Sequence, residues 1–158
     1  MENLNQIGLR KNDIEKISEL LNGLLSDYQI HYQNLRGLHW LVKGERFFSL
    51  HELYEKLYDE AADTIDEIAE RILMLGNTPL HKYQDYLNGS TIQPVENVTD
   101  GKKGLNIVIK EISILLGKAR NILSEAANVK DEGTVALVSE LIPGFEKHLW
   151  MLNACASE

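Results

Sequence analysis

Apolar residues recur every three or four positions along most of this 158-residue chain, and this spacing constrains the fold more than any other feature. Such steps place side chains on one face of an α-helix, whereas a half-buried β-strand alternates at every second position. The first stretch runs from Ile14 to Val42 if His31 is counted on the apolar face. We therefore predict one long amphipathic helix, with His31 as a histidine at the core edge rather than a metal ligand.

Local signals mark where the first two helices begin and end. Residues 12–15, Asn-Asp-Ile-Glu, have the composition of a capping box that would open the first helix. Gly44 interrupts the pattern, and residues 49–52 offer a second capping box, with an earlier start of that helix as the alternative. Gly76 and Pro79 are expected to end the second helix. Its predicted core face comprises Leu50, Leu53, Leu57, Ala61, Ile65, Ile68, Ile72 and Leu75.

The second half of the chain predicts two more long helices after a long connection. A short helix is expected over residues 81–87, and 90–99 has the composition of a loop. Asp100 is expected to cap a helix running to about residue 127, and Asp131 and Glu132 place negative charge at the start of the last helix. Pro143 lies inside that helix and predicts a kink or local break. The pattern indicates an all-α four-helix bundle with one crossover connection.

Length and composition fit a single domain over residues 1–158. Hydrophobic residues make up 44% of the chain and charged residues 25%, a balance typical of globular proteins. No apolar run has the length of a membrane span, and the N-terminus lacks a secretory apolar region. The single cysteine, Cys155, cannot form an internal disulfide and is expected to be structurally minor. We expect a cytoplasmic protein with no membrane partner.

Candidate metal ligands gather on one side of the second helix. On a wheel of 100° per residue with His51 at zero, Glu55, Asp66 and Glu70 fall at about 40°, 60° and 100°, while the apolar face centres near −80°. These groups therefore face away from their own bundle core. The alternative is an ordinary charged helix face, since this segment also holds Asp59, Glu60, Asp63 and Glu67. We assign Glu60, Asp63 and Glu67 to solvent.

The length of the helix separates these candidate ligands into two groups. His51 and Asp66 are 15 residues apart, which at about 1.5 Å per residue is about 22 Å along the axis. One ion holds its ligands at about 2 Å and cannot bind both groups from one chain. Two copies of the helix crossing antiparallel near Ala61 and Ala62 would bring His51 opposite Glu70 and Glu55 opposite Asp66. A two-fold dimer would then form two equivalent sites.

Mixed oxygen and nitrogen ligands of this kind suit iron, with zinc, manganese or cobalt as competitors. The chain contains no Glu-x-x-His pair, which the di-iron sites inside other four-helix bundles use. The spacing therefore favours a site between chains over a site inside one bundle.

Several segments of the chain resemble the Dps family of mini-ferritins. They are LHWLVKG at 38–44, FFSLHE at 47–52, YDE at 58–60, IDEIAER at 65–71 and LGNTP at 75–79. The match is dense over residues 28–80 and continues more loosely through 131–134 and 147–151. The resemblance implies a ferritin-like bundle, a hollow homo-dodecamer built from two-fold dimers, and ferroxidase centres between subunits. The expected activity is oxidation of ferrous iron with hydrogen peroxide and storage of the ferric product.

The resemblance also implies roles for individual residues. His39 and His51 of one subunit and Asp66 and Glu70 of its two-fold partner would bind iron. The turn at Gly44 would bring His39 near His51. Glu55 stands where the family usually has aspartate, at the second metal position.

Further residues outside this set of ligands have two interpretations each. Trp40 corresponds to a tryptophan that would intercept radicals beside the centre, with a packed interface aromatic as the alternative. Asp131 and Glu132 would line an iron-entry pore, although helix capping alone explains both acids.

Two other functions compete with iron oxidation. A DNA-compacting role would need a basic tail, but Met1 to Leu9 contains no lysine or arginine and the formal net charge is −8. Direct DNA binding is therefore not expected at physiological salt. The second rival is a non-enzymatic helical interaction module whose charged face is solvated.

Overall fold

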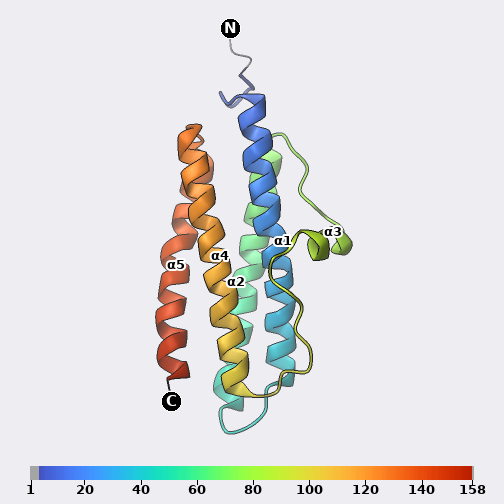
Figure 1. Cartoon of the computed structure of the whole chain (residues 1–158), viewed down its shortest axis with the longest axis vertical. Coiled ribbons are helices and arrows are strands. Elements are labelled where there is room, and N and C mark those ends of the chain that lie inside the picture. The colour runs from blue at the N-terminus through green and yellow to red at the C-terminus, as the bar shows by residue number, and fades with distance from the viewer. Residues whose placement is uncertain (1–3, 158) are drawn as a thin grey trace.

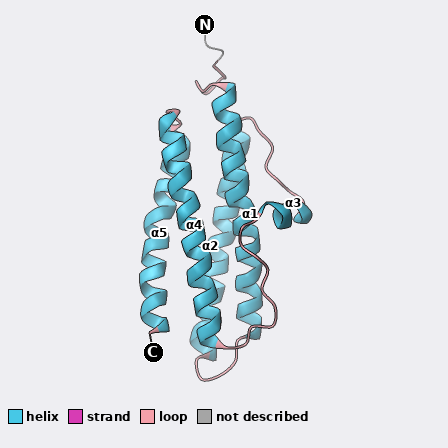
Figure 2. Cartoon of the chain, viewed as in Figure 1, coloured by secondary structure: helices cyan, strands magenta, loops and turns pink. Residues whose placement is uncertain are grey.

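The computed structural model describes residues 4–157, which form five helices and, within that range, no β-strand. The helices are α1 (Lys11–Leu41), α2 (Phe47–Met74), α3 (Tyr83–Gly89), α4 (Gly101–Asn128) and α5 (Glu132–Ala156). Four are long and run side by side, and the short α3 lies in the connection between α2 and α4 (Figure 1). The predicted all-α bundle with a crossover and a short extra helix is confirmed (Figure 2).

The four long helices pair along the bundle. Helix α1 packs against α2, α4 packs against α5, and α1 also contacts α4. The α2–α4 connection runs the length of the bundle and places α3 on the outside of α1 (Figure 1). Between residues 4 and 157 no helix combines the length and apolar character that crossing a membrane requires.

Buried residues on α2 lie on the face that the apolar spacing predicts. Its fully or nearly fully buried side chains are Leu50, Tyr54, Leu57, Ala61, Ile68 and Ile72. Leu53 and Ile65, also predicted for the core, are only half-buried. Tyr54 fits because it faces a glycine of α4: a Cβ added at Gly104 would lie 2.6 Å from the tyrosine hydroxyl. The small residue leaves the space that the ring occupies.

Two of the predicted helix caps are confirmed and two are wrong. The Asp100 carboxylate accepts from the Lys103 amide at 2.7 Å, and Asp131 accepts from the Thr134 amide at 3.0 Å. The capping box at residues 12–15 is absent, because α1 already begins at Lys11 and has no side-chain cap. Helix α2 likewise begins before the box at 49–52, at Phe47, which was the alternative left open.

A kink or a local break was predicted at Pro143; helix α5 runs uninterrupted through this residue, so the break is wrong and the kink stays a prediction. Proline removes the amide that would bond to the carbonyl of Ser139, one turn earlier. Ser139 and Pro143 are both exposed, so water can reach this carbonyl.

Buried polar groups tie the crossover to the bundle. One carboxylate oxygen of Asp27 accepts from the Ser90 hydroxyl at 2.8 Å and from the amides of Thr91 and Ile92 at 2.7 and 3.0 Å. The other oxygen forms an ion pair with Lys118. A fully buried carboxylate thus fixes the segment that follows α3.

His31 is a core histidine, as predicted. Its side chain is 4% exposed, and its Nδ1 lies 2.6 Å from the Glu111 carboxylate on α4. Asn34 donates to the other oxygen of the same carboxylate at 2.5 Å. This cluster satisfies the buried charge of Glu111.

Candidate metal centre

His39 and His51 come together where α1 ends and α2 begins. Gly44, with φ +105°, lies in the turn between them, in the left-handed region that glycine adopts without strain. The two imidazole rings stack with centroids 3.7 Å apart and an angle of 13° between their planes. The predicted proximity of the two histidines is confirmed.

Reciprocal hydrogen bonds fix the orientation of both rings. His39 Nδ1 lies 2.7 Å from the His51 carbonyl oxygen, and His51 Nδ1 lies 2.8 Å from the His39 carbonyl oxygen. A carbonyl can only accept, so in both rings Nδ1 is the protonated nitrogen and donates. This tautomer leaves each Nε2 with a free lone pair, the arrangement in which histidine binds metals.

The three carboxylates proposed as ligands lie on the outer side of α2. Glu55, Asp66 and Glu70 are all exposed, whereas His51 is half-buried. The buried residues of the same helix occupy the opposite side, as the wheel predicts. The structure therefore places these acids where a neighbouring molecule can reach them.

No single chain brings the two groups together. Helix α2 is continuous from Phe47 to Met74, so His51 and Asp66 stay about 22 Å apart along its axis. Within residues 4–157 no three His, Cys, Asp or Glu side chains converge closely enough to hold a metal ion. Ala61 is buried in its own bundle, so it is not available to a crossing helix; of the two predicted alanines only Ala62 is exposed.

Aromatic side chains surround the histidine pair. The Phe47 ring stacks on His51 with centroids 5.0 Å apart, and the Tyr58 ring meets His39 edge to face at 5.3 Å. Trp40, beside His39 in the sequence, is 57% exposed, and the Arg36 guanidinium lies 4.9 Å from the centre of its ring. Tyr58 and Arg36 were not predicted at the centre, because their positions depend on how α1 and α2 pack.

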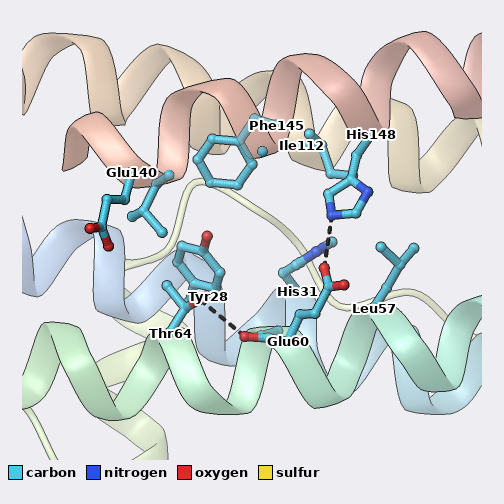
Figure 3. Close-up of a pocket in the computed structure, with 12 residues that line it drawn as sticks. Tyr28, His31, Leu57, Glu60, Thr64, Ile112, Glu140, Phe145 and His148 are labelled. Carbon is cyan, nitrogen blue, oxygen red and sulfur yellow. Dashed lines mark hydrogen bonds and ion pairs between the residues drawn. The ribbon is translucent and has the colours of Figure 1, made fainter. Parts of the chain in front are cut away.

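A separate cavity of about 130 Å³ lies inside the bundle. Figure 3 shows Glu60 of α2 and His148 of α5 pointing toward one another across it, with 2.8 Å between Oε2 and Nε2. Glu60 is predicted from the sequence to face solvent; its side chain is partly exposed but forms this contact as well. Burial raises the pKa of Tyr28, which also lines the cavity, so its phenol stays neutral. None of the residues predicted as metal ligands lines this cavity.

The two acids considered for an iron-entry pore differ in their surroundings. Asp131 is buried, caps α5 and lies 2.6 Å from a guanidinium nitrogen of Arg71. Its carboxylate is therefore engaged within its own chain, which is the capping alternative. Glu132 is exposed in the first turn of α5 and stays a pore candidate.

Comparison with known proteins identifies the fold and the family. A family model described as a ferritin-like domain matches residues 18–158. The DNA protection during starvation protein of Porphyromonas gingivalis is 39% identical over 151 residues, which cover 96% of this chain and 95% of that protein. The chain belongs to the Dps family.

Solved Dps structures agree with this assignment. The Dps protein from Vibrio cholerae O1, described as a member of a broad superfamily of ferritin-like diiron-carboxylate proteins, has a TM-score of 0.94 and 42% identity. The alignment covers 98% of this chain and 96% of that one. The Dps protein from Bacillus brevis has a TM-score of 0.89 and 30% identity, covering 92% and 98%. The bundle described above is thus the Dps form of the ferritin-like fold.

Proposed function

We propose that this Dps-family protein is an iron-storage and detoxification protein, a ferroxidase that oxidises Fe(II) to Fe(III) at dinuclear sites between two-fold-related subunits. The observation that carries the proposal is the stacked pair His39 and His51 with free Nε2 atoms, while His51 lies about 22 Å along α2 from Asp66. Half of a metal site is thereby prepared in one chain, and the other half must come from a second chain.

In the proposed site iron is the substrate. His39 and His51 of one subunit would bind ferrous iron through Nε2, and Asp66 and Glu70 of the partner would supply oxygen ligands that stabilise the ferric product. Glu55 would hold the second iron directly or through water. Zinc, manganese or cobalt would compete for the same ligands.

The oxidant we propose is hydrogen peroxide. Two ferrous ions each give one electron, the oxygen–oxygen bond breaks, and two protons from solvent complete two water molecules. Since both electrons are delivered in one site, no hydroxyl radical is released. The ferric ions would then mineralise inside a shell of twelve subunits, and Glu132 would contribute to the entry pore.

Anaerobic titration with ferrous iron, followed by peroxide, tests this activity. A ferroxidase gives a rapid rise in ferric absorbance that saturates at a fixed number of irons per dimer. An interaction module with a solvated charged face gives no saturable phase, and that result would reject the proposal. His39→Ala/His51→Ala protein serves as the control and should lose the fast phase.

DNA binding is the second candidate function, because several relatives are named DNA protection during starvation proteins. The formal net charge of −8 opposes contact with a phosphate backbone at physiological salt. We expect no shift of duplex DNA on a gel at moderate salt without divalent cations. A shift that persists at moderate salt would show that the protein binds DNA despite its net negative charge.

A further inference from the structure

Two tyrosines continue the row of aromatic rings that starts at the histidine pair. The Tyr58 ring of α2 contacts His39 at 5.3 Å with an interplanar angle of 88°, and it contacts Tyr32 of α1 at 6.0 Å with an angle of 87°. Both separations are those of direct edge-to-face contacts. A continuous path of rings therefore leads from a candidate iron ligand to two oxidisable phenols.

Charges along this path differ from ring to ring. The Arg36 guanidinium lies 5.3 Å from the centre of the Tyr32 ring and 4.9 Å from the centre of the Trp40 ring. A cation over an aromatic face opposes the loss of an electron from that ring. Among Tyr32, Trp40 and Tyr58, it is Tyr58 whose ring contacts His39, so Tyr58 is the best placed electron donor of the three.

We propose that Tyr58 donates an electron to the iron site when that site holds a single ferrous ion. The inference rests on the proposed ferroxidase function. One ferrous ion supplies only one of the two electrons that peroxide needs, and the second would come from the Tyr58 phenol together with its proton. With one further proton from solvent, the oxygen–oxygen bond breaks to give two waters, one ferric ion and a neutral Tyr58 radical.

Tyr32 can take over the radical from Tyr58 and hold it further from the metal. The phenol of Tyr32 can pass an electron and a proton to the Tyr58 radical, which moves the radical one ring further from the site. A later ferrous ion reduces it with one proton, restoring the phenol and giving a second ferric ion. The pair of tyrosines thus prevents a half-filled site from releasing hydroxyl radical.

The test compares Tyr58→Phe with Tyr54→Phe in the assembled protein. Phenylalanine keeps both rings and removes only the oxidisable phenols, and Tyr54 points instead toward Gly104 in the core. Protein carrying less than one ferrous ion per site is mixed with peroxide and frozen rapidly. Electron paramagnetic resonance then measures the radical per ferric ion formed, and ring-deuterated tyrosine assigns the signal.

We expect a tyrosyl signal in the wild-type and Tyr54→Phe proteins and its loss in Tyr58→Phe, where a spin trap should capture more hydroxyl radical. Ferric iron formed without a Tyr58-dependent signal would overturn electron donation by Tyr58 but leave the ferroxidase function standing. A signal that survives Tyr58→Phe but disappears in Trp40→Phe would also overturn electron donation by Tyr58. Absence of ferric iron in every variant would overturn the ferroxidase function, and electron donation by Tyr58 with it.

Discussion

At the scale of single residues, backbone contacts decide what the two histidines can do. Each imidazole donates through Nδ1 to the carbonyl of the other residue, so each has its lone pair on Nε2. The same bonds hold the rings in a stack and tie the end of α1 to the start of α2. One nitrogen of each ring is therefore used for structure, and the other is available to a metal.

His51→Asn separates these two uses of the ring. The asparagine amide can still donate to the His39 carbonyl from nearly the position of Nδ1, but it has no group at the position of Nε2. We expect the free energy of unfolding to change by about 1 kcal/mol or less, while ferrous affinity falls by at least about tenfold. Urea unfolding and anaerobic calorimetry measure the two quantities.

The matched control is His51→Ala, which removes both nitrogens. It should lose stability as well as iron affinity. If His51→Asn binds ferrous iron as tightly as the wild type, Nε2 of His51 is not a ligand.

At the scale of helices, close contacts between elements depend on small residues. Gly104 of α4 is one such position, since any Cβ there would lie 2.6 Å from the Tyr54 hydroxyl and 3.4 Å from a methyl carbon of Leu38. The hydroxyl itself is buried without a hydrogen-bond partner, and burial raises the pKa of Tyr54 to about 12. The Tyr54 hydroxyl oxygen of α2 therefore leaves no room for a Cβ at Gly104 of α4.

Gly104→Ala should therefore destabilise the protein by about 1–3 kcal/mol, despite the better helix propensity of alanine. Tyr54→Phe removes the crowded oxygen and an unsatisfied polar group, so alone it should be neutral or slightly stabilising. In the double variant the cost of Gly104→Ala should largely disappear, which unfolding measurements on the four proteins would show. Additive effects would mean that the hydroxyl is not the source of the clash.

The crossover provides a second prediction at this scale. Asp27→Asn keeps the shape of the side chain but removes the charge opposite Lys118 and weakens the bonds to Ser90, Thr91 and Ile92. We expect a loss of about 2–4 kcal/mol in the free energy of unfolding. Hydrogen exchange should become faster at the Thr91 and Ile92 amides before the rest of the bundle. Ser90→Ala, which removes one bond, should cost about 1 kcal/mol.

The helices and the sides that they bury could be predicted from the sequence, whereas several contacts between helices could not. The 3.6-residue period identified the buried side of α2, because burial there follows directly from the wheel. The Glu60–His148 contact and the row from Tyr58 to Tyr32 depend on the relative placement of helices, which no local spacing encodes. The capping box at residues 12–15 failed because the chain is already helical at Lys11.

At the scale of the whole molecule, the length of α2 is the central constraint. A continuous helix keeps His51 and Asp66 about 22 Å apart, so one copy of the chain cannot complete the proposed site. The exposed positions of Glu55, Asp66 and Glu70 are then useful only if a second copy of α2 crosses the first. Assembly and catalysis are thereby linked in the proposed mechanism.

The most direct test mixes two inactive chains in one assembly. One chain carries His39→Ala and His51→Ala, the other carries Asp66→Ala and Glu70→Ala, and each alone should lack the fast ferric phase after peroxide. Mixed dimers would contain one intact site and one empty site, so we predict recovery of part of the wild-type activity per dimer. Mixed dimers that form fully, as native mass spectrometry would show, yet stay inactive would contradict a site shared between chains.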